Sequence, residues 1–571
     1  MKLEARRDNR PFSFLKKYSP TTYFITAVIV FIFVIPIIRL FSLSFFQDGS
    51  LTVANYTQVL SEPRTWSMLE NTGIMVISST GLAVVLGLLF AWIIAYSDIR
   101  GKKLMQLFIL IPFIIPSYIV TLSWTQLMSR NGLVASFLNL FPFDAVPFNM
   151  YSMGGMIFVL GLSHFPLVFL FTVSTLRKIP QDLEWSARSG GALSVDVFRR
   201  ITLPLALPGL AGGGLLAFIA NLDNFGIPAF LGIPGNIPVL STAIYQEVVG
   251  FGPGAFSRAA TLSVVLAVVA LGGTVFQWII VRKSKQMETV EQDYAPRFHL
   301  GRYRLLTEIS LWSLLLLITV VPLVSMIMSS LIRAYGLTFT WENLTLAHYA
   351  FVLFENNRVQ GAMANSVMLA IVTTAICLFV GTALAYIRSR KPNALNRVLE
   401  VFVGLPYALP GMVLGLAMIF MWLEPIPGWN PGVYGTIGIL LIAYVTRFMI
   451  LQVRGSFTAM SQVDRSMEEA AHVFGAKTVT KWRRIMLPLL LPGLLGGAFL
   501  VFLTALTELT VSSLLRSSGS ETIGLVIFNF EQAGYSTYST AFSTVIVVAI
   551  IVTMTSLYVL QQVWKKRVKE A

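Results

Sequence analysis

Acidic side chains inside long apolar runs are the residues of this sequence most suited to chemistry. Asp223 lies in the run ANLDNFG and Glu508 lies in ALTELT. A charge at the centre of a bilayer costs about 2.5–3.5 kcal/mol on insertion scales, so such residues are candidates for function. We predict that they and their polar neighbours Asn224 and Thr507 contact a translocated cation or form a gate. A hydrogen bond from a helix end to a neighbouring helix explains them equally well, and both interpretations remain open.

Patterns typical of catalysis or metal binding are absent from the sequence. Cys377 is the only cysteine, and the four histidines (His164, His299, His348 and His472) are too scattered for a zinc site. The P-loop pattern GxxxxGK[ST] does not occur, so the chain lacks that phosphate cradle. We therefore expect no covalent chemistry on a substrate and no cofactor bound by this chain, so that any ATP would have to be bound elsewhere.

Two long polar segments with related sequences stand between apolar runs. They are LEWSARSGGALSVDVFRRITLPLALPG (183–209) and MEEAAHVFGAKTVTKWRRIMLPLLLPG (467–493). Acidic residues suit the amino end of a helix, and a glycine suits the turn that ends one. Each segment is therefore predicted to form a helix, a turn at the glycine, and a second helix that enters the membrane through Leu-Pro.

These segments resemble the EAA loop of ABC importer permeases, in which Glu-Ala-Ala is followed by three residues and Gly, and later by Leu-Pro. In the first segment Trp185 stands where the family has its glutamate, and the carboxylate one position earlier is expected to reach a different partner or none. The matching residues and the adjacent carboxylates are Glu184, Ala187, Gly191 and Ala192 in the first segment, and Glu468, Glu469, Ala470, Ala471, Gly475 and Ala476 in the second.

The resemblance implies that each loop forms a coupling helix that docks in a groove on an ATPase subunit, so that two ATPase copies bind. A helical hairpin that only joins two spans would explain one such loop. Two copies in register, on the same predicted side of the membrane, favour the coupling function.

Composition identifies the class of protein around these loops. Hydrophobic residues make up 55% of the 571 residues and charged residues only 12%, against about 25% in soluble domains. Roughly 20 apolar residues are needed for a helix to cross a bilayer. The sequence predicts an all-α integral membrane protein of about twelve spans, at 23–46, 71–97, 105–127, 154–174, 205–226, 259–281, 308–332, 364–387, 399–423, 435–452, 489–513 and 541–563.

Basic residues gather in alternate loops, which explains the net charge of +15 without nucleic acid. The positive-inside rule then places both termini in the cytoplasm of a bacterial inner-membrane protein. The basic leader before the first apolar run resembles a secretory signal. Its apolar stretch is too long and no small-residue cleavage site follows, so we expect a retained span.

An internal repeat relates the two halves of the chain. Asn71 pairs with Asn365 and Gly87 with Gly381 at an offset of 294, and IPFIIP (111–116) pairs with LPYALP (405–410). After a longer external segment in the first half, the offset becomes 284 and aligns the two coupling loops. We predict two parallel six-helix repeats, with a first half at 1–280, a cytoplasmic linker at 281–306 and a second half at 307–571.

The whole chain resembles the fused two-half permeases of the ferric-iron import family, which share a layout with thiamine and aminophosphonate permeases. The resemblance implies the type I importer fold, alternating access, two ATPase copies and an external substrate-binding protein. Ferric iron is the first expectation for the cargo, with thiamine or an aminophosphonate next. A proton-coupled transporter of the major facilitator type is the rival class, suggested by SDIRGKK (97–103), but it leaves the duplicated loops unexplained.

Overall fold

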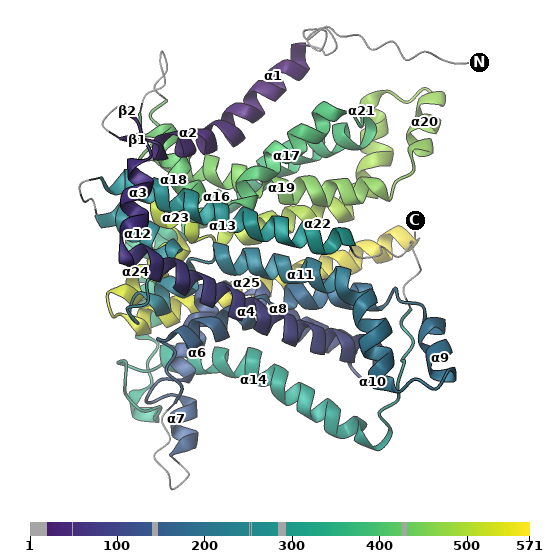
Figure 1. Cartoon of the computed structure of the whole chain (residues 1–571), viewed down its shortest axis with the longest axis horizontal. Coiled ribbons are helices and arrows are strands. Elements are labelled where there is room, and N and C mark those ends of the chain that lie inside the picture. The colour runs from purple at the N-terminus through teal and green to yellow at the C-terminus, as the bar shows by residue number, and fades with distance from the viewer. Residues whose placement is uncertain are drawn as a thin grey trace.

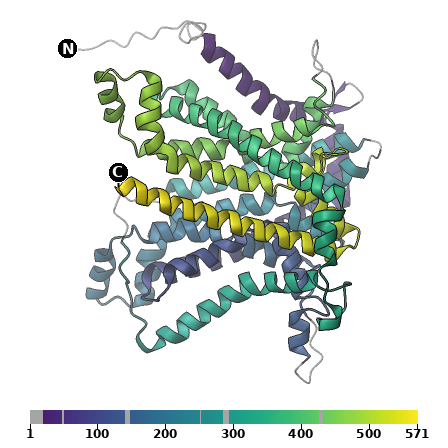
Figure 2. The same cartoon turned by 180° about the vertical axis from the view of Figure 1, so that it is seen from behind.

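Long apolar helices that run side by side make up most of the chain (Figures 1 and 2). The structure is a computed structural model that describes residues 20–47, 50–139, 147–250, 252, 254–283, 293–424 and 431–570. The basic leader and residues 284–292 of the predicted linker lie outside these residues. A two-residue antiparallel pair, β1 (Phe46–Gln47) and β2 (Ser50–Leu51), is the strand pairing found within them.

The elements of the first half alternate long helices with short ones. They are α1 (Pro20–Ile29), α2 (Ile35–Ser44), α3 (Ala54–Ser61), α4 (Pro63–Tyr96), α5 (Lys102–Ile114), α6 (Ser117–Leu127), α7 (Leu133–Leu138), α8 (Met153–Leu176), α9 (Gln181–Ser189), α10 (Ser194–Val197), α11 (Leu203–Asp223), α12 (Leu240–Gly250) and α13 (Ala255–Lys283). Single π-helical turns at η2 (Val30–Val34), η3 (Phe198–Thr202) and η4 (Pro228–Gly232) join some of them.

The second half repeats this order. Its helices are α14 (Arg304–Ser330), α15 (Ala347–Ala350), α16 (Asn357–Arg390), α17 (Ala394–Ala408), α18 (Gly411–Trp422), α19 (Ile437–Ser461), α20 (Arg465–Val473), α21 (Thr478–Lys481), α22 (Leu487–Leu506), α23 (Thr510–Leu515), α24 (Ile523–Gln532) and α25 (Ser536–Glu570). The short turns η5 (Gly301–Tyr303), η6 (Trp341–Asn343), η7 (Phe351–Glu355) and η8 (Trp482–Met486) complete it.

The predicted number of spans is confirmed, but two of the spans are bent pairs of helices and not single helices. Ten helices in the described part of the chain are long and apolar enough to cross a membrane. The predicted spans 105–127 and 399–423 are instead the helix pairs α5–α6 and α17–α18, bent by 99° and 107°. Each bend precedes a proline, Pro116 or Pro410, because a residue before proline is driven out of the helical conformation. Twelve spans result if each bent pair counts as one.

Two matched three-helix groups form the cores of the halves, α4–α8–α11 and α16–α19–α22. The glycines that the repeat aligns lie where these helices approach most closely. A β-carbon at Gly87 would fall 2.5 Å from Cβ of Val168, and one at Gly381 would fall 3.1 Å from Cβ of Gln452. The paired glycines thus allow α4 and α16 to pack closely against α8 and α19.

The first helix of each sequence half packs against the bent pair of the other half. The helices α2 and α18 are neighbours, α1 and η2 lie against α17, and α14 lies against α5 and α6. Figure 1 shows both crossings, with α1 and α2 beside α17 and α18 and with α14 beside α6. The two halves therefore hold each other by exchanged helices as well as by their cores.

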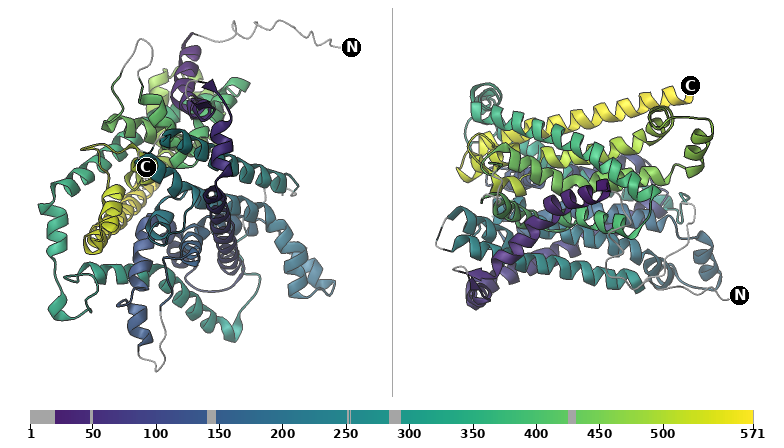
Figure 3. Two further views of the ribbon diagram at one scale, coloured as in Figure 1. Left: turned by 60° about the vertical axis from the view of Figure 1, so that its left-hand side comes forward. Right: turned by 90° about the horizontal axis from the view of Figure 1, so that it is seen from above.

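The short helices mark the two ends of the bundle. The elements α9, α10, α20 and α21 lie at one end, which we call the coupling end, and β1, β2, α7, α12 and α24 lie at the other, the distal end (Figure 1). The rotated views in Figure 3 show the same lengthwise arrangement. Both aligned polar segments are thus on one side of the molecule.

Candidate functional site

The two coupling segments form the predicted helix, turn and helix, as α9 with α10 and α20 with α21. Both first helices end in a Schellman motif, in which the sixth amide donates to the first carbonyl. The amide of Ala192 donates to the carbonyl of Ala187 (3.0 Å), and that of Ala476 donates to Ala471 (2.9 Å). Gly191 and Gly475 have φ of 86° and 74°, which is the left-handed conformation that glycine adopts at least cost.

This geometry explains the residue types of the sequence pattern. The last residue of Glu-Ala-Ala, Ala187 or Ala471, provides the carbonyl that accepts the last hydrogen bond of the motif. The glycine adopts the left-handed conformation, and the backbone amide of the alanine after it donates that hydrogen bond. A β-carbon at either glycine would meet nothing within 4 Å, so the requirement lies in the backbone conformation and not in crowding.

Glu468 holds α20 to the body of the second half. Its side chain is 8% exposed and accepts hydrogen bonds from Lys481 Nζ (2.9 Å), the Tyr386 hydroxyl (2.9 Å) and Arg390 Nε. Burial would raise the pKa of this carboxyl, but the hydrogen bonds from Lys481, Tyr386 and Arg390 outweigh it and keep the pKa below its usual value. The carboxylate therefore ties the coupling helix to the end of α16.

Glu184 is the counterpart of Glu468 and holds α9 in the same way. It accepts a hydrogen bond from Thr202 Oγ1 (2.7 Å), and Arg297 NH1 lies 3.3 Å from its other oxygen. Arg297 also stacks on the ring of Tyr96 at 4.6 Å. The basic partner of Glu184 comes from a different part of the chain than the partners of Glu468, because Arg297 lies in the predicted linker and not in a helix of the core.

The residue that follows each of these carboxylates points outward. Trp185 is 52% exposed, and the side chain of Glu469 is 69% exposed and lies 3.6 Å from Arg465. The offset of 284 pairs Glu184 with Glu468 and Trp185 with Glu469. The family motif alone had suggested that the first-half carboxylate was displaced by one position, whereas the repeat offset identifies the equivalent residue.

Apolar side chains cover the outer surfaces of both coupling segments. Two aligned pairs are exposed, Leu183 with Met467 and Val195 with Val479. The second segment also exposes Phe474 (89%) and Val473 (84%). Large apolar side chains gathered at a polar end of a membrane protein are typical of a protein-binding surface.

Asp223 joins the two halves at the centre of the molecule. It is the last residue of α11, and its Oδ1 accepts a hydrogen bond from the amide of Gly411 (2.5 Å), the first residue of α18. Its Oδ2 lies 2.6 Å from NH2 of Arg447 on α19. One carboxylate of the first half thus caps a broken helix and neutralises a cation of the second.

The other predicted pathway residues lie around the same helix ends but are bound locally. Glu508 accepts from the amides of Val511 (2.7 Å) and Ser512 (3.0 Å) at the start of α23. Asn224 donates to Ser117 Oγ (3.0 Å), and Thr507 donates to its own helix at the carbonyl of Leu503 (2.9 Å).

Both acidic residues stand where one helix ends and the next begins. Helix α11 ends at Asp223 and α22 ends at Leu506, and the two carboxylates accept hydrogen bonds from free backbone amides at the starts of α18 and α23. Figure 1 shows α11, α18 and α23 in the body of the bundle.

Arg447 is a functional candidate that the sequence analysis missed. Its side chain is 8% exposed, and its NH1 has no hydrogen-bond partner in the described part of the chain. The sequence pattern does point to this residue. Arg447 interrupts the apolar run IGILLIAYVTRFMILQ, and a buried charge needs a partner of opposite charge. At the aligned positions the first half has Ser163 followed by His164, whose Nδ1 lies 2.6 Å from Oδ1 of Asn221 within that half.

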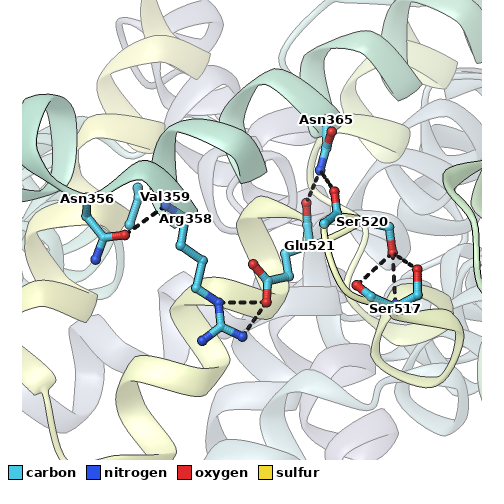
Figure 4. Close-up of polar contacts among 8 residues, drawn as sticks. Asn356, Arg358, Val359, Asn365, Ser517, Ser520 and Glu521 are labelled. Atoms are coloured by element: carbon cyan, nitrogen blue, oxygen red, sulfur yellow. Dashed lines mark hydrogen bonds and ion pairs between the residues drawn. The ribbon is translucent and has the colours of Figure 1, made fainter.

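Matched residues tie the distal loops to α4 and α16. Asn71 donates to the carbonyl of Pro238 (3.0 Å), and Asn365 donates to those of Gly519 (2.9 Å) and Glu521 (3.0 Å). Figure 4 shows the second of these clamps, where Arg358 also binds the Glu521 carboxylate through Nε (2.6 Å) and NH2. The asparagines that the repeat aligns therefore have the same structural role in both halves.

These features define a class. Two repeated helical cores with exchanged first helices, and two coupling helices at one end, are the arrangement of an ABC importer permease. The profile of the family described as "Binding-protein-dependent transport system inner membrane component" matches residues 83–287 and 378–570, more than half of the chain. The chain belongs to this family and is a multi-pass membrane protein, so the interpretation as a major facilitator is excluded.

Curated relatives match both the whole chain and single halves. The ferric transport system permease protein FbpB of Actinobacillus pleuropneumoniae is 25% identical over 92% of this chain and 75% of its own length. The Fe(3+)-transport system permease protein FbpB 2 of Haemophilus influenzae is 22% identical over 86% of this chain and 89% of its own. The molybdenum transport system permease protein ModB of Escherichia coli is 31% identical over 34% of this chain and 83% of its own.

A solved structure also matches part of the chain. It is that of a bacterial ABC transporter involved in the import of the acidic polysaccharide alginate, with 19% identity and a TM-score of 0.38, covering 47% of this chain and 95% of that one.

Proposed function

We propose that this chain is the permease of an importer for ferric iron, driven by two copies of a cytoplasmic ATPase and supplied by an external substrate-binding protein. The observation that carries the cargo assignment is the match over most of the chain to fused permeases named for ferric transport. The molybdenum permease aligns with only about a third of the chain and supports the architecture of a half.

The coupling segments support the ATPase part of the proposal. Their exposed apolar side chains Leu183, Met467, Val195 and Val479 occupy aligned positions, which suits two copies of one partner. Exposed residues outside these pairs, such as Trp185 and Phe474, differ between the two segments, so different side chains would surround each docking site. With the ATPases bound there, the coupling end and both termini would lie in the cytoplasm.

Two carboxylates would transmit motion of the ATPases to the spans. A pull on α20 reaches α16 through Glu468, Tyr386 and Arg390, and a pull on α9 reaches the start of α11 through Glu184 and Thr202. Both helices belong to the core groups, so paired movement of the coupling helices would move both cores.

The contact between Asp223 and Arg447 would act as a gate between the halves. Asp223 links the end of α11 to α19 through Arg447 and to the start of α18 through the amide of Gly411, so separation of the cores along these contacts must break them. In the open state the freed carboxylate and Glu508 would offer negative charge to a cationic cargo.

The test is uptake of radioactive ferric iron by proteoliposomes that contain this chain with its ATPase and binding protein. We expect ATP-dependent uptake that excess unlabelled ferric iron suppresses and that thiamine, an aminophosphonate and molybdate leave unchanged. Uptake of one of those competitors instead would overturn the cargo assignment alone. Uptake driven by a proton gradient without ATP would overturn the proposed mechanism.

A further inference from the structure

A cavity of about 350 Å³ lies between α1 and the helices α16, α17 and α19. Ligand sites in proteins have volumes of roughly 300–1,000 Å³. Its position follows from the exchanged helix, because α1 lies against α17 only lightly and leans away from it toward Pro20 (Figure 1). The space is therefore bounded by helices of both sequence halves.

The lining of the cavity is amphipathic. Apolar side chains come from all four helices, and polar side chains gather where α16 ends and α17 begins. The apolar residues are Ile25, Leu384, Ile387, Leu399, Val403 and Val453, and the polar residues are Thr22, Arg388, Lys391, Asn393, Asn396 and Glu400.

The polar part of the cavity carries a net positive charge. Arg388 Nε donates to Glu400 Oε2 (2.9 Å), so those two charges cancel. Lys391 is exposed and forms no ion pair with any residue of the described chain. One cation therefore remains at the mouth of an apolar cavity.

The surroundings of the cavity face lipid. Phe24 on α1 is 69% exposed, and Val401 on α17 is 61% exposed. The cationic turn lies at the coupling end, because the neighbouring Arg390 binds Glu468 of the coupling helix. The cavity is thus at the level of one headgroup layer, with its apolar part directed into the bilayer.

We propose that this cavity binds one anionic glycerophospholipid of the leaflet at the coupling end. The phosphate would lie against the ammonium group of Lys391 and the side-chain amide of Asn393, and the first part of an acyl chain would lie along Ile387, Leu399 and Val403. Basic pockets between membrane helices are typical binding sites for anionic headgroups. The segment that precedes α1 is itself basic, so charge favours an external anion as the occupant.

The first half offers no such site at the aligned positions. An offset of 294 puts Ile94 opposite Arg388 and Ser97 opposite Lys391. There α14 closes directly on α5, with Trp312 against Phe108 at 5.4 Å and Glu308 accepting from the amide of Arg100 (2.8 Å). The proposal therefore predicts one bound lipid for each chain.

Native mass spectrometry of the purified full-length chain, reconstituted in nanodiscs of phosphatidylglycerol or of phosphatidylcholine and then released, tests the proposal. We expect one retained phosphatidylglycerol and no retained phosphatidylcholine. Each unit of charge near an anionic headgroup changes affinity about fivefold, so Lys391→Glu should weaken retention by about thirtyfold. Lys391→Arg should keep the lipid, and Ile25→Trp should exclude it by filling the cavity.

The matched control is Arg397→Glu, which changes the same charge on an exposed part of α17 that does not line the cavity. Equal retention of both lipids, or equal loss in Lys391→Glu and Arg397→Glu, would overturn the proposal. Displacement of the lipid by inorganic phosphate alone would assign the site to a free anion and also overturn it. Each variant is compared only after it elutes as a single species with an unchanged melting temperature.

Discussion

Glu184 and Glu468 occupy equivalent positions on the two coupling helices, and both turn their carboxylates into the protein. Their cationic partners are not equivalent. Lys481 and Arg390 flank Glu468 within the second half, whereas Arg297 reaches Glu184 from the segment between the halves. The same anchoring function is thus achieved with different parts of the chain, and this difference makes the two helices separable in experiments.

The first prediction concerns the anchor of α20. Glu468→Gln should lower ATP-dependent transport at least tenfold, because it leaves Lys481 and Arg390 buried without their counter-charge, a loss typically of about 3–5 kcal/mol. Transport and ATPase activity of the reconstituted complex are the measurements. Glu342→Gln is the control, since that side chain is exposed and lies outside both coupling segments, and it should change transport less than twofold. An equal loss in both variants would show that the buried contact is not the anchor.

The second prediction concerns pH. The pKa of Glu468 is held below its usual value, so its contribution is complete above the unfolded-state pKa of about 4.3 and is lost as the pH falls through the lower, folded-state pKa. Backbone amide exchange of residues 465–473, corrected for the intrinsic rate, should therefore accelerate below about pH 4. Glu468→Gln should remove this dependence. A loss of protection that begins near neutral pH would contradict the assigned direction of the shift.

The third prediction separates conformation from size at Gly475. A β-carbon in the left-handed conformation costs roughly 1–2 kcal/mol, and asparagine tolerates it better than other residues. Gly475→Val should uncouple ATP hydrolysis from transport, Gly475→Ala should do so in part, and Gly475→Asn should retain most of the transport. The ratio of transported substrate to ATP hydrolysed is the measurement. Because the site is open, loss of coupling in the order of side-chain size would argue instead for a clash with the ATPase.

Much of this architecture could be predicted from the sequence because its signals are local or repeated. Apolar length predicts spans, and the glycine and alanine spacing encodes the helix ends at Gly191 and Gly475. The prolines Pro116 and Pro410 favour a break in a helix, but a proline in a sequence does not say how far the chain turns. The turns of 99° and 107° depend on the packing of the exchanged helices on each bent pair.

Contacts between segments that are far apart in the sequence could not be predicted from single motifs. Arg297 stands far from α9 in the sequence, and only the folded chain brings it to Glu184. The pairing of Asp223 with Arg447 crosses from one half to the other and has no counterpart in the repeat, where position 447 aligns with Ser163. The predicted domain boundaries and the roles of the pathway residues stay predictions.

The last prediction tests whether Asp223 and Arg447 act as one unit. Asp223→Asn should destabilise the protein by about 3–5 kcal/mol, because it leaves the buried charge of Arg447 unpaired. Arg447→Met should cost less, because Asp223 is 29% exposed and keeps its hydrogen bond from Gly411. The double variant should be less destabilised than the sum of the two, with a coupling energy of about 1–3 kcal/mol from thermal unfolding of the purified chain. Additive effects would mean that the contact contributes nothing as a pair.

Transport in the same variants distinguishes a gate from a purely structural contact. If the pair holds the halves closed, both single variants should raise basal ATP hydrolysis while transport falls. Thr504→Ala, at a residue outside the predicted pathway whose hydroxyl bonds to its own helix, should leave both rates within about twofold of the parent, as is usual for a change outside a buried network. A fall of transport and ATP hydrolysis together, in proportion to lost folded protein, would leave Asp223 and Arg447 as a structural bridge and exclude the gate.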